Sequence, residues 1–181
     1  MDISYEIIRS SRKSLSLQIT PQGQVLVRCP NRMPKREIDA FVESKRAWLQ
    51  KHLTKIESQP QLPTFSPEEI YTLADRALVD LPERVRKFAP LVGVTYGRIT
   101  IRSQHTRWGS CSAKGNLNFN CLLMLCPEEV RSYVVIHELC HRKQLNHSPR
   151  FWAEVERIMP DYKMHRKWLK DNGGPLIARL P

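Results

Sequence analysis

The stretch that decides the fold is His137-Glu138-Leu139-Cys140-His141, which lies in a predicted helix that begins at Pro127. Residues four positions apart on a helix differ by about 40° around its axis, so the two histidines face the same way. Two imidazoles at this spacing can hold a borderline metal ion such as Zn²⁺. Glu138 lies about 100° around from His137. It is therefore a poor third ligand, but it can reach a metal-bound water as a general base.

A third metal ligand is expected just beyond this helix, and His147 follows six residues after His141. The spacing equals that of the metzincin pattern, in which the chain turns after the second histidine and returns a third. Gln144 replaces the glycine usual in that turn, so Asn146 is expected to end the helix and to turn the chain in a left-handed conformation. A chance match to all these positions is on the order of one in ten thousand. Incidental surface histidines are therefore a poor explanation.

The N-terminal third predicts a small sheet followed by a helix. Three short, mostly alternating segments, residues 5–9, 14–19 and 24–27, are typical of strands, and the turn at 20–23 predicts an antiparallel β meander. Apolar residues at helical spacing then continue from Pro34 to Ile56. Residues 58–64 are the best candidate linker. We therefore expect two parts, 1–60 as a lobe or an extension of the core, and 61–181 as the domain that holds the histidines.

The remainder of the chain is predicted to be rich in helices. Ser66 and Glu69 form a capping box at a helix start, Pro82 predicts a break or kink, and Gly93 ends the helical stretch. Strands are expected at 94–102 and 116–125 with a loop at 104–115, and helices are expected to begin at 127, 149 and 160, the last ending at 173–174. Strands and helices are mixed without a βαβ repeat, so the predicted fold class is α+β.

Composition excludes several classes of protein. With 41% hydrophobic and 26% charged residues in 181, the chain is neither disordered nor fibrous. No apolar run approaches the ~18 residues of a membrane helix, and the first residues lack the basic-then-apolar order of a secretory signal. We therefore expect a soluble, cytoplasmic protein with no membrane partner. Five scattered cysteines without a Cys-x-x-Cys pair predict reduced, mostly buried thiols.

The net charge of +11 is spread along the chain. A basic balance of this size favours acidic partners such as nucleotides or nucleic acid. A solvated basic surface without any partner explains it equally well. Charge alone therefore does not choose a function.

The histidine motif and several shorter segments of the sequence together resemble the signature of the YgjP-like (SprT-type) zinc metallopeptidases. The resemblance covers nearly the whole chain. The segments that match are 12–15, 107–112, 115–120, 137–141, 146–152, 161–162, 166–169 and 172–173. The resemblance implies a zincin-like metallopeptidase core in residues 61–181. It also implies one Zn²⁺ per chain on His137, His141 and His147. Glu138 would then activate a zinc-bound water for attack on a peptide carbonyl.

In zincins an edge strand above the metal helix binds an extended peptide by backbone pairing. The segment 116–120 is our candidate for that edge, which makes Asn116, Asn118 and Asn120 candidate substrate-binding residues. An ordinary half-buried strand is an equally good interpretation.

Two tyrosines and one loop are further candidates. Tyr133, one turn before His137, and Tyr162 are each able to donate a hydrogen bond to an oxyanion, although buried structural tyrosines are the better interpretation. Trp108-Gly109-Ser110-Cys111 lacks the strand–turn–helix setting of a nucleophile turn. We expect this loop to shape the cleft.

A polypeptide is the leading substrate, and two alternatives stay open. A zinc-dependent nucleotide pyrophosphohydrolase would use the same metal site with Arg142, Lys143 and Arg150 on the phosphates. The absence of a glycine-rich phosphate loop weighs against it. A DNA-associated protease or binding protein would fit the +11 charge, but the sequence has no zinc ribbon or RNA-binding signature.

Overall fold

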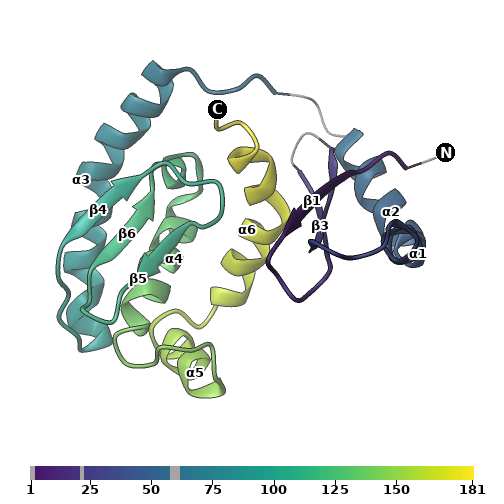
Figure 1. The fold of residues 1–181 in the computed structure, drawn as a ribbon. Helices are drawn as coiled ribbons and strands as arrows, with labels where there is room; N and C mark the ends of the chain where they lie inside the picture. Colours follow the sequence, from purple (N-terminus) through teal and green to yellow (C-terminus); the bar gives the residue numbers. More distant parts are fainter. Residues whose placement is uncertain (1–2, 21–22, 58–61) are drawn as a thin grey trace. The chain divides into compact units, whose positions relative to one another are not determined.

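The computed structural model describes residues 3–20, 23–57 and 62–181 and has the predicted α+β fold (Figure 1). The chain forms two compact units, residues 1–62 and 63–181. The predicted boundary at residues 60 and 61, most of the candidate linker, and Pro21 and Gln22 of the predicted turn lie outside the described residues.

The N-terminal unit contains a three-stranded sheet of β1 (Glu6–Ser10), β2 (Ser16–Ile19) and β3 (Val25–Pro30). The strand order is β1-β3-β2, and β3 pairs parallel with β1 and antiparallel with β2. The predicted antiparallel meander is therefore wrong. The physical reason is that β3 has the most apolar face, with Val25, Val27 and Cys29 all buried. The strand with the most apolar area to bury takes the central position.

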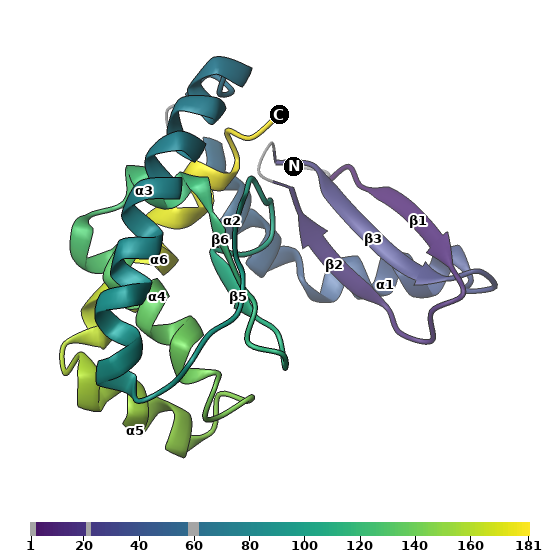
Figure 2. The same cartoon turned by 90° about the vertical axis from the view of Figure 1, so that its left-hand side faces the viewer.

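Two helices cover one face of this sheet, α1 (Lys35–Ser44) and α2 (Arg46–Glu57) (Figure 2). The predicted helical stretch does begin after Pro34, but it is interrupted at Lys45. Ile38, Val42 and Leu49 pack against β3 in the core of this unit. The interruption lets both helices place apolar residues on the same sheet.

The second unit opens with the long helix α3 (Pro67–Val92). Both predicted ends are confirmed, since Ser66 and Glu69 form a capping box and Gly93 ends the helix in the left-handed conformation. Of the break or kink predicted at Pro82, the break does not occur, because the helix continues through the proline. Leu81 and Val85 on either side are fully buried. Their packing holds the helix together across the one backbone hydrogen bond that proline removes.

The sheet of the second unit consists of β4 (Ile99–Arg102), β5 (Gly109–Cys111) and β6 (Leu117–Asn120). Its order is β4-β6-β5, with β6 parallel to β4 and antiparallel to β5 (Figure 1). The prediction of β6 as an edge strand is therefore wrong. β4 and β5 are the edge strands, although the residues of β5 fall in the predicted loop.

The predicted strand at 116–125 ends early. The short 3-10 helix η1 (Cys121–Leu125) replaces its second half. The side-chain oxygen of Asn120 accepts a hydrogen bond from the backbone N–H of Leu122 and caps this helix. A local cap thus overrides the apolar pattern that predicted a strand.

Three helices complete the second unit, α4 (Glu128–Cys140), α5 (Pro149–Ile158) and α6 (Tyr162–Ile177). α4 begins where predicted, and its predicted apolar face (Val135, Ile136, Leu139 and Cys140) is fully buried. It ends at Cys140, however, and not at Asn146. α6 continues past the predicted stop at Gly173-Gly174. The buried Gly173 packs against an indole ring, which explains a glycine inside a helix.

Two predictions from composition can be compared with this fold. Among the described residues no helix is both long and apolar enough to cross a membrane. All five cysteines are free thiols, and four of them are buried, as predicted.

Candidate metal centre

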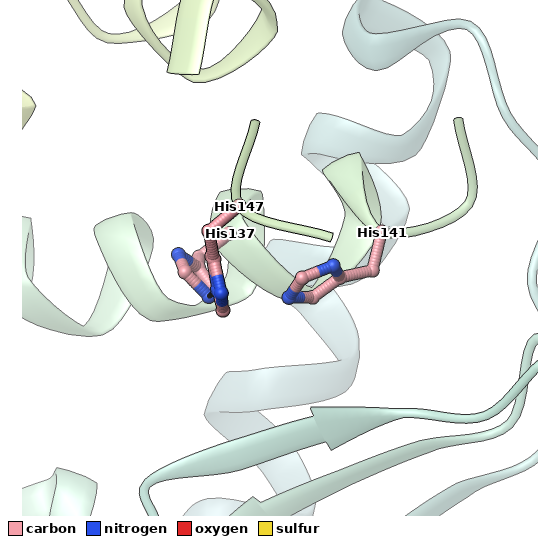
Figure 3. Close-up of side chains that lie close together, drawn as sticks. All are labelled: His137, His141 and His147. Atoms are coloured by element: carbon pink, nitrogen blue, oxygen red, sulfur yellow. Dashed lines mark hydrogen bonds between the residues drawn. The ribbon is translucent and has the colours of Figure 1, made fainter. Parts of the chain in front are cut away.

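Three histidine side chains come together at the end of α4. The possible ligand atoms of His137, His141 and His147 all lie within 4.8 Å of one another. The Nε2 atoms of His137 and His147 are 3.0 Å apart, and the ring of His141 points toward the other two (Figure 3). Tetrahedral coordination at metal–nitrogen distances of about 2.0–2.1 Å requires separations of this order between donor atoms.

Helical geometry positions the first two histidines. His141 follows the last residue of α4, but its φ of −63° and ψ of −17° are still helical, so the four-residue spacing holds. Its Nδ1 lies 3.0 Å from the backbone carbonyl oxygen of Gln144. A carbonyl can only accept, so Nδ1 donates and the Nε2 lone pair remains available to a metal ion.

A compact turn returns His147 to the other two histidines. The backbone N–H of Gln144 donates to the carbonyl of Cys140. The side-chain oxygen of Asn146 accepts from the N–H of Ser148, which in turn caps α5. Only glycines have positive φ among the described residues, so the prediction of a left-handed Asn146 is wrong. The chain therefore reverses here without a residue of positive φ, and the glycine of the metzincin turn is not needed.

Phe151, for which the sequence predicts no role, lies against all three imidazoles. Its ring centroid is 4.8, 4.5 and 4.9 Å from those of His137, His141 and His147. It is fully buried in α5, whereas Trp152 packs beside His137 and His147. Phe151 lies in the first turn of α5, directly after the turn that carries His147, and no local sequence signal identifies its contact with the three imidazoles.

The electrostatics of the site favour neutral imidazoles. Burial lowers the pKa of His137 to about 3, and the like charges of His141, His147 and Arg166 add to this effect. Burial also lowers the pKa of His141. Neutral imidazole is the form that binds metal. Three imidazole donors, of which His137 and His141 are kept neutral by burial and His141 has its tautomer fixed by a carbonyl, therefore fit a divalent metal such as zinc.

Glu138 points from α4 toward β5. Its side chain is 5% exposed, and burial raises the pKa of its carboxyl to about 8, although the charge of Arg107 opposes the rise. A hollow of about 280 Å³ lies between β5 and the histidines. Its lining consists of Gly109, Ser110, Cys111, His137, Glu138, His141, Leu145 and His147. The candidate base and the candidate ligands thus open on one space.

The three candidate asparagines, Asn116 just before β6 and Asn118 and Asn120 within it, do not line that hollow. Asn120 is 0% exposed, and its amide donates to the carbonyls of Gln104 and Arg107. Asn118 donates to Ser110 across the sheet, and the Asn116 side chain accepts from the N–H of Arg98. Their side chains hold loops and strands together. This corrects the expectation that they face a substrate at an edge.

The two candidate tyrosines lie behind the histidines. Tyr133 and Tyr162 are both buried and stack at 6.5 Å between ring centroids, and Tyr162 stacks on Trp152 at 5.4 Å. Burial raises the pKa of Tyr133 to about 12. Neither residue lines the hollow, in keeping with the structural interpretation of both.

Two of the three cations considered for a nucleotide substrate have protein partners. Arg142 donates to the backbone carbonyls of Thr95 and Ala113. Lys143 forms an ion pair with Glu154. Both side chains therefore support the fold, which disfavours the nucleotide alternative.

A family model described as the YgjP-like metallopeptidase domain matches residues 13–78 and 70–172 of the sequence. The chain belongs to the YgjP-like family. This YgjP-like protein is thus a metallopeptidase by family, and its three histidines lie close enough together to hold a metal ion. No curated protein matched the chain.

Two solved structures resemble parts of this YgjP-like protein. The metallopeptidase zymogen abylysin of Pyrococcus abyssi is 24% identical, with a TM-score of 0.47. The match covers 51% of this chain and 95% of abylysin. The metallopeptidase zymogen jannalysin of Methanocaldococcus jannaschii is 22% identical, with a TM-score of 0.43 and coverage of 50% of this chain and 92% of jannalysin.

Proposed function

We propose that this YgjP-like protein is a zinc-dependent peptidase with one metal ion per chain, held by His137, His141 and His147. The observation that carries the proposal is the convergence of three imidazoles beside a buried carboxyl group in one hollow. When bound, zinc would supply a Lewis acid that polarises the scissile carbonyl and acidifies water. In this proposal residues 61–181 form a zincin-like catalytic domain and residues 1–60 an additional lobe.

Glu138 is the proposed catalytic base. Burial gives its carboxylate an unusually high affinity for a proton. This suits a group that takes a proton from the attacking water and returns it to the amine of the leaving peptide. His141 contributes through its fixed tautomer, since its Nδ1 donates to Gln144 and its Nε2 faces the site.

The free edge of β5 is the proposed binding site for the peptide backbone. The N–H of Asn120 donates to the carbonyl of Trp108, and the N–H of Ser112 donates to that of Asn116. Backbone groups alternate in an antiparallel ladder, so those of Gly109 and Cys111 point away from β6. An extended peptide can pair with them as an added strand. This geometry favours an unfolded or flexible polypeptide substrate.

The test combines metal content with peptide cleavage. We expect about one zinc per wild-type chain by plasma mass spectrometry and loss of that zinc in His147→Ala. Glu138→Gln should retain zinc but lose at least about 100-fold in kcat on a mixed peptide library, since positioned acid–base catalysis contributes this much. Stoichiometric zinc in His147→Ala would overturn the ligand set. Cleavage by Glu138→Gln at the wild-type rate would overturn the role of Glu138.

A further inference from the structure

The side chain of Glu138 lies directly against the backbone of β5. A Cβ atom added to Gly109 would be 2.7 Å from Oε1, 2.8 Å from Cγ and 3.0 Å from Cδ of Glu138. Real Cβ atoms essentially never come within 3.0 Å of such atoms. The carboxylate therefore occupies the space that a side chain at position 109 would need.

The backbone conformation of Gly109 does not itself require glycine. The described glycines with positive φ are Gly23, Gly93 and Gly115, and Gly109 is not among them. Any L-residue can adopt its strand conformation. Glycine at this position is thus explained by the close approach of another group, and that group is Glu138.

The residue before Gly109 fixes the position of the strand. The indole of Trp108 packs on Gly173 of α6, where an added Cβ would lie 2.9 Å from Cζ2 and 3.1 Å from Nε1. The carbonyl of Trp108 also accepts a hydrogen bond from the N–H of Asn120 at 2.9 Å. The start of β5 is therefore held from α6 on one side and from β6 on the other.

The neighbouring glycine in α6 shows that this contact is local. An added Cβ at Gly174 would meet nothing within 4 Å. A glycine inside a helix costs about 1 kcal/mol relative to alanine. At Gly173 that cost is explained by the indole.

We propose that Gly109 is a positioning residue for Glu138, and that Trp108, packed on Gly173, holds Gly109 in the place where the carboxylate rests on it. This inference rests on the proposed role of Glu138 as the base. It assigns a role to Trp108-Gly109: the pair restricts the directions in which the carboxylate can point. Because β5 is held by Trp108 and by its pairing with β6, a side chain at 109 would force Glu138 into another rotamer.

The first experiment measures Gly109→Ala in the full chain. Because a displacement of about 1 Å at a catalytic group costs about 100-fold in rate, we expect kcat to fall about 100-fold. KM should stay within about threefold and zinc content should be unchanged, because neither the peptide-pairing backbone nor the histidines change. A kcat equal to that of the wild type would overturn the proposal.

A double-mutant cycle on thermal stability tests the same contact without substrate. Gly109→Ala should lower Tm in the wild-type background and leave it nearly unchanged in the Glu138→Ala background, where the space is vacant. Equal losses in both backgrounds would overturn the proposal. If Gly109→Ala alone fails to fold, folding of Gly109→Ala/Glu138→Ala supports the contact. A wild type without peptidase activity would contradict the proposed function, and this cycle would still decide the contact.

Adjacent glycines of α6 provide a matched pair for the second part of the proposal. Gly173→Ala should lower kcat about tenfold at unchanged zinc content, whereas Gly174→Ala should leave kcat unchanged. Adding Trp108→Phe to Gly173→Ala should restore part of the lost rate, because the smaller ring leaves room for the methyl group. Equal rates for the two alanine variants would overturn the role of Trp108 and Gly173.

Discussion

The carboxyl groups at the two ends of α4 have opposite environments. At the N-terminal half, Arg131 donates to Asp80 of α3 at 3.1 Å, and Asp80 also pairs with Arg84 at 2.7 Å. Arg84 reaches Ser132 of α4 as well. At the C-terminal half, Glu138 is more deeply buried and forms no ion pair within the described parts of the chain.

The pKa values of the two carboxyls follow from this difference. Burial alone would raise the pKa of Asp80. The hydrogen bond from Arg84 and the charges of Arg84, Arg131 and Arg76 outweigh burial, so the pKa is lowered. Burial also raises the pKa of Glu138. Only the charge of Arg107 opposes this effect, so the pKa stays raised. A buried carboxyl without a bonded cation destabilises the fold. The buried carboxyl of Glu138 therefore points to a functional role, whereas the paired carboxylate of Asp80 stabilises the fold.

The largest expected effect concerns the packing around the functional half. Phe151→Ala should destabilise the protein by about 3–5 kcal/mol and weaken zinc binding at least about tenfold, because the ring orients all three imidazoles. Denaturant unfolding and competition with a zinc chelator measure the two effects. Phe119→Ala is the matched control, since this buried ring lies in β6. Equal zinc affinities in the two variants would contradict the role of Phe151.

Asp80→Asn should destabilise the protein by about 1–3 kcal/mol at pH 7, because it removes the carboxylate that Arg84 and Arg131 share. A lowered pKa contributes stability above the pKa of the unfolded chain, and this is lost as the pH falls through the lowered value. The deficit of the variant should therefore be constant near neutral pH and shrink below about pH 4. Urea unfolding across pH checks this, and a deficit independent of pH would contradict it. Peptide cleavage should be unchanged.

Replacing the carboxyl group by an amide at Glu138, in the C-terminal half of α4, should instead increase stability. In metal-free protein, the pKa of Glu138 rises from 4.5 to about 8 on folding. Ionisation therefore opposes folding increasingly as the pH rises between these values. Glu138→Gln should be more stable than the wild type by about 4 kcal/mol at pH 8, with the difference vanishing below pH 4. Thermal unfolding after chelation measures it. A destabilised variant at pH 8 would mean that the carboxylate has a partner in solution.

The smallest expected effect is at the rim of the functional half. Leu145 lines the hollow and is 73% exposed. If it contacts an apolar substrate side chain, Leu145→Ser should raise KM about threefold to tenfold for peptides with bulky apolar residues and leave zinc binding unchanged. Leu91→Ser, at an exposed leucine outside this lining, is the control. An unchanged KM for every peptide would remove Leu145 from the binding site.

The local features of the chain were predictable from its sequence. The capping box at Ser66, the end at Gly93 and the cap at Ser148 all depend on neighbouring residues. The spacing of His137 and His141 follows from helical geometry, and the family signature is contained in short segments. Such features need no knowledge of distant contacts.

Only the tertiary structure decided the sheet order, the edge strand and the surroundings of Glu138. Asn120 and Gly109 have no local signal for their roles, because one is defined by the loop that it holds and the other by the carboxylate that rests on it. Pairing of β3 with β1, and of β6 between β4 and β5, depends on which strand buries the most apolar area. The sequence by itself thus determined the spacing of the histidines on α4 and the caps of α3 and α5, because these features depend on local spacing and capping. Packing between distant segments determined which strands form the sheet edges and how the carboxyl group of Glu138 is held against β5.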